Sequence, residues 1–544
     1  MFLSIAALVA AGCGSSGKGG SGGSGGGTGT GGATGQGGGT GTGGASSTGG
    51  SSGTGGVTGS GGSTVTGGAG GTGGAHATGG AGGAPATGGA SGSGGKGGSG
   101  GTGGGNPDGG AAVATPSFDW VGVVGTGQSL SVGTTPANLT AQPYNNKMLA
   151  LNGAKVPDTG PDGGVLPGVD PWDPTVGGLT IVPLVEPVRA LETSYPSPYP
   201  GNIYGETLHA AMANEITRFV KAASAAADYI TVHTIVGESG QGIVALVKQT
   251  PSTGSIGRAY AASLFEAGAI TRLAKAAGKS YGVGVIVMTH GETDCNNTGY
   301  GDALVQLLAD YNTDLPAITG QTYQIPMYLS QQHGCPGAPA CTKSSDLRPT
   351  ANDFEWQLPV QHPGQFVCTG PKYQYPAHSD GDGIHLNVTG YELLGEKTAQ
   401  VYYQRAVLGQ NWQPLMPVSA TRSGNVVTVQ FHVPVPPLNW DTSFDPPAIT
   451  EWKNGKGFEL FTASGNVTIS SVAISGDSVQ ITAGGTLPAS GLTVAYALTS
   501  QGKQSSNHSK AVRWGQLRDS DPFMGGTTKM ANPNYAVSFS MPVQ

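Results

Sequence analysis

Short apolar runs alternate with longer stretches of helical period between about residues 116 and 408. The runs that predict strands are rich in β-branched residues and lie at 120–125, 229–236, 283–289 and 325–330. The stretches with apolar residues at helical spacing lie near 206–225, 257–277 and 389–407. This alternation is typical of a parallel sheet with helices on both faces, so residues 116–410 predict a three-layer α/β/α domain. Such sheets bind ligands at the carboxyl ends of their strands.

The pattern changes after Pro414. Short apolar runs, separated by Ser-Gly, Gly-Asp and Gly-Gly turns, lie at 426–432, 458–462, 467–474, 479–482 and 492–498. No stretch of helical period intervenes between them. Residues 415–544 therefore predict a small all-β sandwich domain.

The first 112 residues are dominated by glycine: 52 of the 99 glycines of the chain fall within residues 1–110. A tract of Gly, Ser, Thr and Ala cannot bury enough apolar surface to offset the backbone entropy of folding, so residues 14–112 predict a disordered tether. The apolar run at 2–11 is followed by Gly12 and Cys13 and resembles a lipoprotein signal peptide. Residues 1–13 are therefore expected to be that signal, with Cys13 as the lipidated residue.

The net charge and the predicted signal peptide limit which kinds of partner the protein can bind. The chain has 25 Lys and Arg against 32 Asp and Glu, a formal net charge of −7. That balance argues against nucleic-acid binding, which needs a basic patch or stripe. With a signal peptide, the expected location is outside the bacterial cytoplasm, as a cell-surface lipoprotein or a secreted protein. A lipid anchor is the only membrane contact that we expect.

Four cysteines remain after Cys13. An exported protein meets an oxidising compartment, which favours disulfides. Cys335 and Cys341 bracket a Pro/Gly-rich stretch that predicts a stapled loop, and by elimination Cys295 is expected to pair with Cys368.

A Gly- and Ser-rich segment, Gly125 to Ser131, directly follows the first predicted strand. A serine at a strand-to-helix turn can present its hydroxyl at the sheet edge, while neighbouring N–H groups face an incoming oxyanion. Ser129 is therefore the candidate nucleophile. Ser239 is its rival, because Gly-x-Ser-x-Gly would indicate an α/β-hydrolase elbow, but Gln241 stands where that pattern needs its last glycine.

A second polar segment, Asp382-Gly-Ile-His385, precedes the last predicted helix. A carboxylate three residues before a histidine can accept the imidazole N–H, fix the tautomer and stabilise the cation that forms when the ring takes a proton. Asp380 is the only rival for this orienting role. The segment predicts His385 as general base and Asp382 as its orienting carboxylate.

A third segment, from His290 to Asp294, ends the predicted strand at 283–289. Its polar side chains are suited to donating hydrogen bonds at the sheet edge. His290, Glu292 and Asp294 could alternatively ligate a metal, but no second histidine lies at ligand spacing, so no metal site is predicted.

Together these segments resemble the SGNH (GDSL-like) hydrolase superfamily, and within it the sialate O-acetylesterase and carbohydrate acetylesterase branch. The branch begins with Gly-Gln-Ser, here Gly127-Gln128-Ser129, and ends with Asp-Gly-x-His, here Asp382-Gly-Ile-His385. The resemblance spans most of residues 120–405. It implies a three-layer hydrolase with Ser129, His385 and Asp382 as catalytic residues and without a metal or organic cofactor.

The resemblance also implies an oxyanion hole. Its expected donors are the Ser129 N–H and a backbone N–H of the turn after the second strand, where Gly240 and Gly242 are both open as candidates. The branch usually supplies a further donor from a glutamine, and this chain has His290 at that place. His290 is therefore expected to replace the glutamine as donor.

The sequence thus predicts a serine esterase that deacetylates a polysaccharide or glycan through an acyl-enzyme. A lipase or polyester hydrolase with the same triad is one alternative. A non-catalytic surface protein that binds carbohydrate is the other, and only the change to His290 favours it.

Overall fold

The computed structural model describes residues 113–134, 141–151, 172–186, 205–251, 255–334, 344, 347, 350–375, 384–443, 454–498 and 513–544. The chain divides into two units, Met1–Ser99 and Gly100–Gln544, and every described residue belongs to the second. The predicted signal peptide, Cys13 and most of the tether lie outside the described residues. Among the described helices, none is both long and apolar enough to cross a membrane.

Seven of the described strands form one sheet, in the order β3-β2-β4-β1-β5-β6-β7. Their bounds are β1 Trp120–Gly127, β2 Lys147–Ala150, β3 Thr180–Pro183, β4 Ile230–Ile235, β5 Tyr281–Thr289, β6 Met327–Gln331 and β7 Phe366–Pro371. All neighbours run parallel except β2 and β3. The predicted parallel sheet is confirmed, with β1, β4, β5 and β6 close to the four predicted strands.

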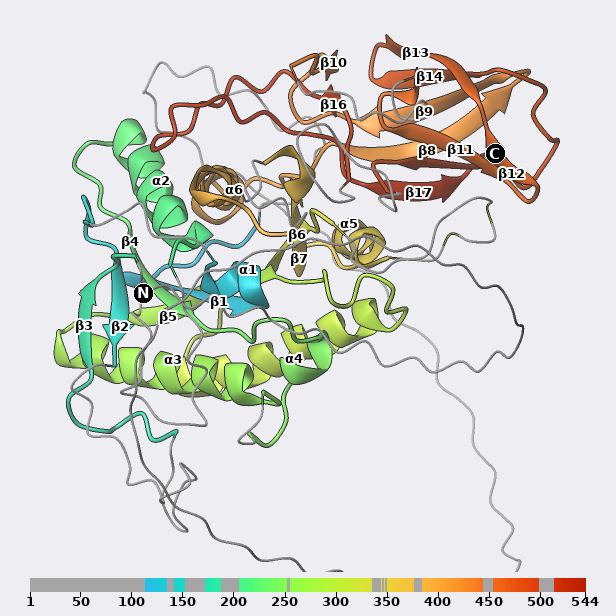
Figure 1. The fold of residues 1–544 in the computed structure, drawn as a ribbon. Coiled ribbons are helices and arrows are strands. Elements are labelled where there is room, and N and C mark those ends of the chain that lie inside the picture. Colours follow the sequence, from blue (N-terminus) through green and yellow to red (C-terminus); the bar gives the residue numbers. More distant parts are fainter. Residues whose placement is uncertain are drawn as a thin grey trace, which may run out of the picture. The chain divides into compact units, whose positions relative to one another are not determined.

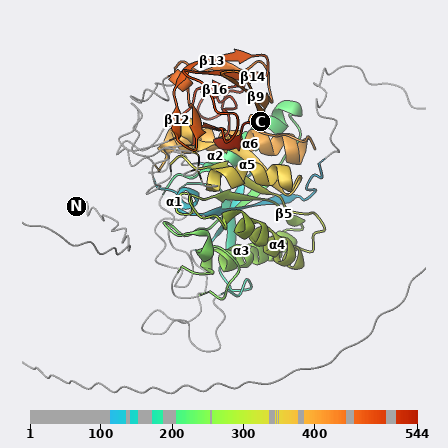
Figure 2. The same cartoon turned by 90° about the vertical axis from the view of Figure 1, so that its right-hand side faces the viewer.

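Helices cover both faces of this sheet. They are α1 (Ser129–Val132), α2 (Leu208–Ala223), α3 (Arg258–Ala276), α4 (Tyr300–Thr319), α5 (Ala351–Gln361) and α6 (Val388–Tyr402), which continues into the π-helical turn η4 (Tyr403–Val407). Figures 1 and 2 show α3 and α4 on one face and α2 and α6 on the other. Separate apolar cores fill the two interfaces, one with α3 and α4 and one with α2 and α6. The three-layer architecture is confirmed.

The helix starts follow from their capping residues. Asn387 caps α6 by accepting a hydrogen bond from the Gly390 N–H at 2.9 Å, as its place before the predicted helix indicated. Thr207 accepts from the His209 N–H in the same way at the start of α2. Each cap fixes where its helix begins, and the cap of α6 fixes the chain just after His385.

Residues beyond Pro414 form strands, as predicted. Two four-stranded antiparallel sheets, β12-β11-β15-β17 and β13-β14-β9-β8, enclose an apolar core, and β10 pairs with β16. The bounds are β8 Met416–Ser423, β9 Val426–His432, β10 Asn439–Trp440, β11 Phe458–Thr462, β12 Gly465–Val467, β13 Ile469–Ser475, β14 Ser478–Ala483, β15 Thr493–Tyr496, β16 Leu517–Arg518 and β17 Phe539–Pro542. An α/β domain followed by a β domain is therefore the observed fold class.

The core of the β domain includes side chains from the α/β domain. Trp356 of α5, Cys368 of β7 and Tyr373 are part of the cluster that holds Phe458 and Phe539. The Tyr373 hydroxyl donates to the Ala536 carbonyl at 2.6 Å. The two domains thus share one hydrophobic core at this junction.

The disulfide prediction for Cys368 is wrong. Cys368 is a free, fully buried thiol, and burial raises its pKa to about 12. The side chain belongs to the core shared with the β domain, whereas Cys295 lies in the loop after β5, where its carbonyl accepts from the Ala351 N–H. Cys295 is disulfide-bonded, but not to Cys368. Cys335 and Cys341 lie outside the described residues.

Candidate active site

Ser129 is the first residue of α1, immediately beyond β1. The turn depends on Gly127, which has φ +143° and whose missing Cβ would lie 2.0 Å from the Thr289 carbonyl oxygen of β5. That carbonyl accepts a hydrogen bond from the Gln128 N–H at 3.1 Å. A residue with a side chain cannot make this close approach, so the glycine sets how sharply the chain turns toward Ser129.

The Ser129 hydroxyl contacts the predicted base. Ser129 Oγ lies 2.8 Å from His385 Nε2, a hydrogen-bond distance between groups 256 residues apart in sequence. His385 comes from the segment just before α6, and Ser129 comes from the carboxyl end of β1. Ser129 is only 6% exposed, so its contact with His385 is largely shielded from solvent. The structure thus brings together the predicted nucleophile and base.

The carboxylate predicted to orient His385 belongs to a segment that the structure does not describe. Asp382 and its rival Asp380 both lie outside the described residues. The assignment of Asp382 therefore stays a prediction.

The loop after β4 passes close to Ser129 and is held at several points. The Glu238 N–H donates to the Gly127 carbonyl at 2.9 Å, and the Glu238 carboxylate binds Arg258 of α3 through two hydrogen bonds of 2.8 and 2.7 Å. A Cβ on Gly237 would lie 2.4 Å from Ser131 Oγ. The bidentate ion pair of Glu238 and Arg258 fixes the loop beside Ser129.

Ser239 has no comparable setting. It is exposed in this loop and is followed by the short 3₁₀ turn Ile243–Ala245, without the strand-turn-helix geometry of a nucleophile elbow. Ser129 is the serine in contact with the predicted histidine base.

The His290 ring, predicted to donate to an oxyanion, hydrogen-bonds other groups in the structure. Its ring is fully buried, with Nε2 3.0 Å from the Gln241 carbonyl oxygen and Nδ1 3.2 Å from the Tyr300 hydroxyl. Burial lowers the pKa of His290, so the ring is neutral and carries one N–H. A carbonyl can only accept, so that N–H lies on Nε2 and donates to Gln241. His290 therefore fixes the loop after β4 and has no N–H left for an oxyanion.

Asp294 holds the same loop from its other end. Its Oδ2 accepts from the Ile243 N–H at 2.5 Å, and its Oδ1 accepts from the Asn297 amide at 2.9 Å. The Thr293 N–H reaches the side chain of Gln128, the residue before the nucleophile, at 3.3 Å. The segment from His290 to Asp294 thus acts as a frame for the residues around Ser129.

Glu292 forms a buried ion pair with Lys372, at 2.7 Å between Oε1 and Nζ. Burial alone would raise the pKa of Glu292, but the charge and hydrogen bond of Lys372 outweigh it, so the pKa lies below its ordinary value. His290, Glu292 and Asp294 each have a hydrogen-bond or ion-pair partner elsewhere in the protein, and His290 Nε2 lies 3.8 Å from Asp294 Oδ2.

The two glycines left open as oxyanion donors have different surroundings. A Cβ on Gly242 would lie 3.0 Å from the Asp294 carboxylate, whereas the space around Gly240, which has φ +73°, is open. A carboxylate beside Gly242 would repel an oxyanion. Of the two glycines, Gly240 therefore has the more open surroundings.

Sequence reasoning missed two side chains that hold the site, Arg258 and Lys372. Neither lies in a motif, and each pairs with a glutamate from another element, 20 and 80 residues away. The only available signal was that Glu238 and Glu292 follow buried strands, where a carboxylate needs a cationic partner.

No family model matches the chain, and no curated protein matches it in sequence. Among solved structures, a carbohydrate acetylesterase from Xanthomonas citri is similar at 14% identity and a TM-score of 0.45, covering 77% of this chain and 80% of that one. A protein from Arabidopsis thaliana (15%, TM-score 0.35) and NanS (13%, TM-score 0.31) match 53% and 54% of this chain and 100% and 98% of their own. At these identities and TM-scores, the three structures are distant from this chain.

Proposed function

We propose that the protein is a serine esterase that removes acetyl groups from carbohydrate. The observation that carries the proposal is the 2.8 Å contact between Ser129 Oγ and His385 Nε2, made at the carboxyl edge of a parallel sheet. A serine hydroxyl is a weak nucleophile until an adjacent base takes its proton, and this contact supplies the base.

In the proposed reaction, Ser129 Oγ bonds to the ester carbonyl carbon while His385 Nε2 takes the hydroxyl proton. The bond from that carbon to the sugar oxygen then breaks, and the sugar oxygen leaves with the proton from His385. Water attacks the acetyl-enzyme and gives a proton to the same nitrogen. The acyl–Oγ bond breaks, Ser129 regains the proton and acetate leaves.

Two backbone N–H groups are proposed to bind the oxyanion. Ser129 opens α1, so its N–H has no acceptor within the helix. The Gly240 N–H is the second donor, since the space around this residue is open and no carboxylate adjoins it. Preorganised donors of this kind stabilise the charge that develops on the carbonyl oxygen.

The acetyl group and the carbohydrate are the finer part of the proposal. They rest on the resemblance of Gly127-Gln128-Ser129 and Asp382-Gly-Ile-His385 to the acetylesterase branch. A lipase or polyester hydrolase would use the same residues on longer acyl chains.

An acyl-chain series tests both parts. Chromogenic esters from acetate to octanoate, with acetylated xylan and acetylated sialic acid beside them, are assayed on the parent chain, Ser129→Ala and Ser239→Ala. We expect hydrolysis to fall beyond the acetyl and propionyl esters, and the Ser129 variant to lose about 10⁴-fold or more in turnover. Preference for long chains would indicate the lipase, and activity that depends on Ser239 would refute the proposed nucleophile.

Export is part of the same proposal. Lipidation at Cys13 would place the enzyme at the cell surface, and fractionation of cells that express the parent chain or Cys13→Ser tests it. The proposal expects the parent chain in the membrane fraction and the variant outside it. Equal partition of the two chains would contradict lipidation.

A further inference from the structure

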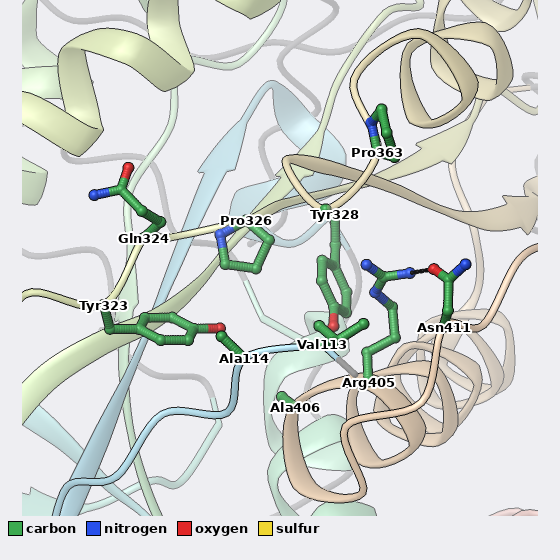
Figure 3. A pocket seen from close by; sticks show the side chains of 11 residues that line it. Val113, Ala114, Tyr323, Gln324, Pro326, Tyr328, Pro363, Arg405, Ala406 and Asn411 are labelled. Atoms are coloured by element: carbon green, nitrogen blue, oxygen red, sulfur yellow. Dashed lines mark hydrogen bonds between the residues drawn. The ribbon is translucent and has the colours of Figure 1, made fainter. Parts of the chain in front are cut away.

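A pocket of about 380 Å³ lies at the edge of the parallel sheet opposite the nucleophile. It is lined by residues near the amino ends of β6 and β7 and at the end of η4: Val113, Ala114, Tyr323, Gln324, Pro326, Tyr328, Pro363, Gly364, Arg405, Ala406 and Asn411 (Figure 3). The pocket thus lies at the amino ends of β6 and β7, whereas Ser129 follows the carboxyl end of β1. From Val388 to Arg405, α6 and η4 span about 25 Å at 1.5 Å per residue, so the pocket is separate from the active site.

Arg405 is the charged side chain of this pocket. It is only 4% exposed, and its Nη1 donates to the Asn411 side-chain oxygen and the Trp412 carbonyl, both at 3.0 Å. No carboxylate of the described residues forms an ion pair with it, and the described lining contains no Asp or Glu. Burial lowers the pKa of Arg405, but an arginine stays charged at neutral pH.

The two tyrosines of the pocket do not neutralise this charge. In Figure 3, Tyr328 stands between Pro326 and Arg405, and the Tyr323 ring extends across the pocket below Pro326. Burial raises the pKa of Tyr323 to about 12 and that of Tyr328 further, so both are neutral phenols with a hydroxyl to donate. The described lining of the pocket therefore presents one positive charge and no negative charge.

A buried cation without an ion-pair partner is costly even where neutral groups hydrogen-bond to it, and a bound anion lowers that cost. A further hydrogen bond joins the guanidinium to the Tyr328 hydroxyl, and after these three bonds the guanidinium, which has five N–H groups, still has donors to offer. A planar guanidinium can donate two parallel hydrogen bonds to the two oxygens of one carboxylate. The walls add the apolar faces of Pro326, Pro363 and Tyr323, against which a sugar ring can pack. The volume is within the range of small-molecule sites.

We propose that this pocket binds an acidic sugar, a hexuronate unit whose carboxylate is held by Arg405 while the hydroxyls of Tyr323 and Tyr328 donate to the ligand. The choice of a sugar over another small carboxylate rests on the proposed function. The pocket would then hold an acidic unit of the glycan chain at a distance from the ester that Ser129 attacks.

Titration calorimetry of the full chain with glucuronate, galacturonate, glucose and acetate tests this directly. We expect a hexuronate to bind at least about tenfold more tightly than glucose, because glucose offers nothing to the guanidinium. Acetate is expected to be weaker as well, because it lacks the ring that packs on the walls. Equal affinity for glucuronate and glucose, or no binding of either hexuronate, would overturn the proposal. Equal affinity for acetate and the hexuronates would show that the sugar ring contributes nothing to binding.

Variants locate the site. Arg405→Lys keeps the charge but loses the planar guanidinium, and we expect it to weaken hexuronate binding about tenfold or more. Tyr323→Phe removes one hydroxyl and keeps the ring, so it tests the pocket even if the arginine variant fails to fold. The Tyr323 variant should weaken binding several-fold and leave hydrolysis of a small acetyl ester unchanged. Undiminished binding in both variants would refute the site.

Ser129→Ala is the matched control. It removes the nucleophile and is expected to bind the hexuronate as the parent chain does. Loss of binding in this variant would assign the ligand to the active site and overturn the pocket. An inactive parent chain that still binds hexuronate through Arg405 would refute the esterase and leave the pocket standing.

Discussion

The side-chain amide of Gln331, at the end of β6, pairs with the backbone of Ser538 as a neighbouring strand would. Gln331 Nε2 donates to the Ser538 carbonyl at 2.8 Å, and Gln331 Oε1 accepts from the Ser538 N–H at 2.7 Å. Gln331 is fully buried. The last segment of the chain therefore completes the α/β domain at this point.

Removal of residues 411–544 is expected to unfold the α/β domain. Buried charges would lose their partners: Lys397 binds Asp521 and Asn534, and Asp353 accepts from the Ser540 N–H. Stripping one partner from a buried charge costs about 3 to 5 kcal/mol. We expect the fragment 113–410 to aggregate or to unfold without cooperativity in urea, as judged by size-exclusion chromatography and circular dichroism.

Removal of residues 1–112 is the matched control, and we expect the fragment 113–544 to keep its stability and its ester hydrolysis. A soluble 113–410 fragment that unfolds cooperatively and hydrolyses acetyl esters would show that the two domains are independent.

His290 is expected to matter for the stability of the loop that it holds. His290→Ala leaves the Gln241 carbonyl without its donor, which should lower the free energy of unfolding by about 1 to 3 kcal/mol in urea titration. If instead stability is unchanged and turnover falls about 10²- to 10³-fold, His290 donates to the oxyanion after all.

The buried pair of Lys372 and Glu292 should show the asymmetry of a desolvated ion pair. Lys372→Met alone is expected to lower the free energy of unfolding by about 3 to 5 kcal/mol, and adding Glu292→Gln should recover part of that loss. The control is Lys279→Ala: Lys279 and Asp119 lie 3.7 Å apart, each 46% exposed, and the change should stay within about 1 kcal/mol. A single loss for Lys372→Met no larger than the control would contradict the pairing.

Cys368 should behave as a protected thiol. We expect it to resist alkylation in the folded protein and to react after denaturation, since it is fully buried with a pKa raised to about 12. Peptide mapping without reductant checks this. A cross-linked peptide that joins Cys368 to Cys295 would contradict the structure.

The His209 and His233 pair should make stability depend on pH. Their Nδ1 atoms lie 2.9 Å apart, and burial lowers the pKa of His209 to about 3 and that of His233 well below its ordinary value. In the unfolded chain a histidine titrates near about 6.5. The unfolded state therefore binds more protons below that value, and stability is lost as pH falls from about 6.5 toward 3.

His209→Asn tests this dependence. Urea unfolding between pH 6 and pH 4 should show a slope that is shallower by up to about 1.4 kcal/mol per pH unit in this variant. Identical slopes for the parent chain and the variant would mean that the buried ring does not control the loss.

Local patterns predicted much of the fold and part of the site. β1, β4, β5 and α6 carry long apolar runs or a clear cap, so their positions are set by nearby residues. The four-residue strands β2 and β3 have too few residues to show a period. Ser129 and His385, which the structure brings within 2.8 Å of each other, were singled out because each lies in a motif at a strand end or before a helix.

The missed features depend on contacts between distant segments. The environment of Cys368 is set by a β domain that begins about 50 residues later in the chain, and that of His290 by the carbonyl of Gln241, 49 residues away. The pairing of Cys368 was predicted by elimination and the role of His290 by analogy with a family. Neither kind of reasoning contains information about these distant neighbours. These are the positions where the structure changed the assignment.

The separation of Ser129 and His385 by 256 residues also sets when the proposed site can form. A growing chain carries the serine long before the histidine is synthesised, and Ser538 follows its partner Gln331 by 207 residues. Such non-local contacts make folding slow and leave intermediates with unpaired groups. The proposed active site consequently stays unformed while the α/β domain is being synthesised, and its serine and histidine meet only once both segments have folded.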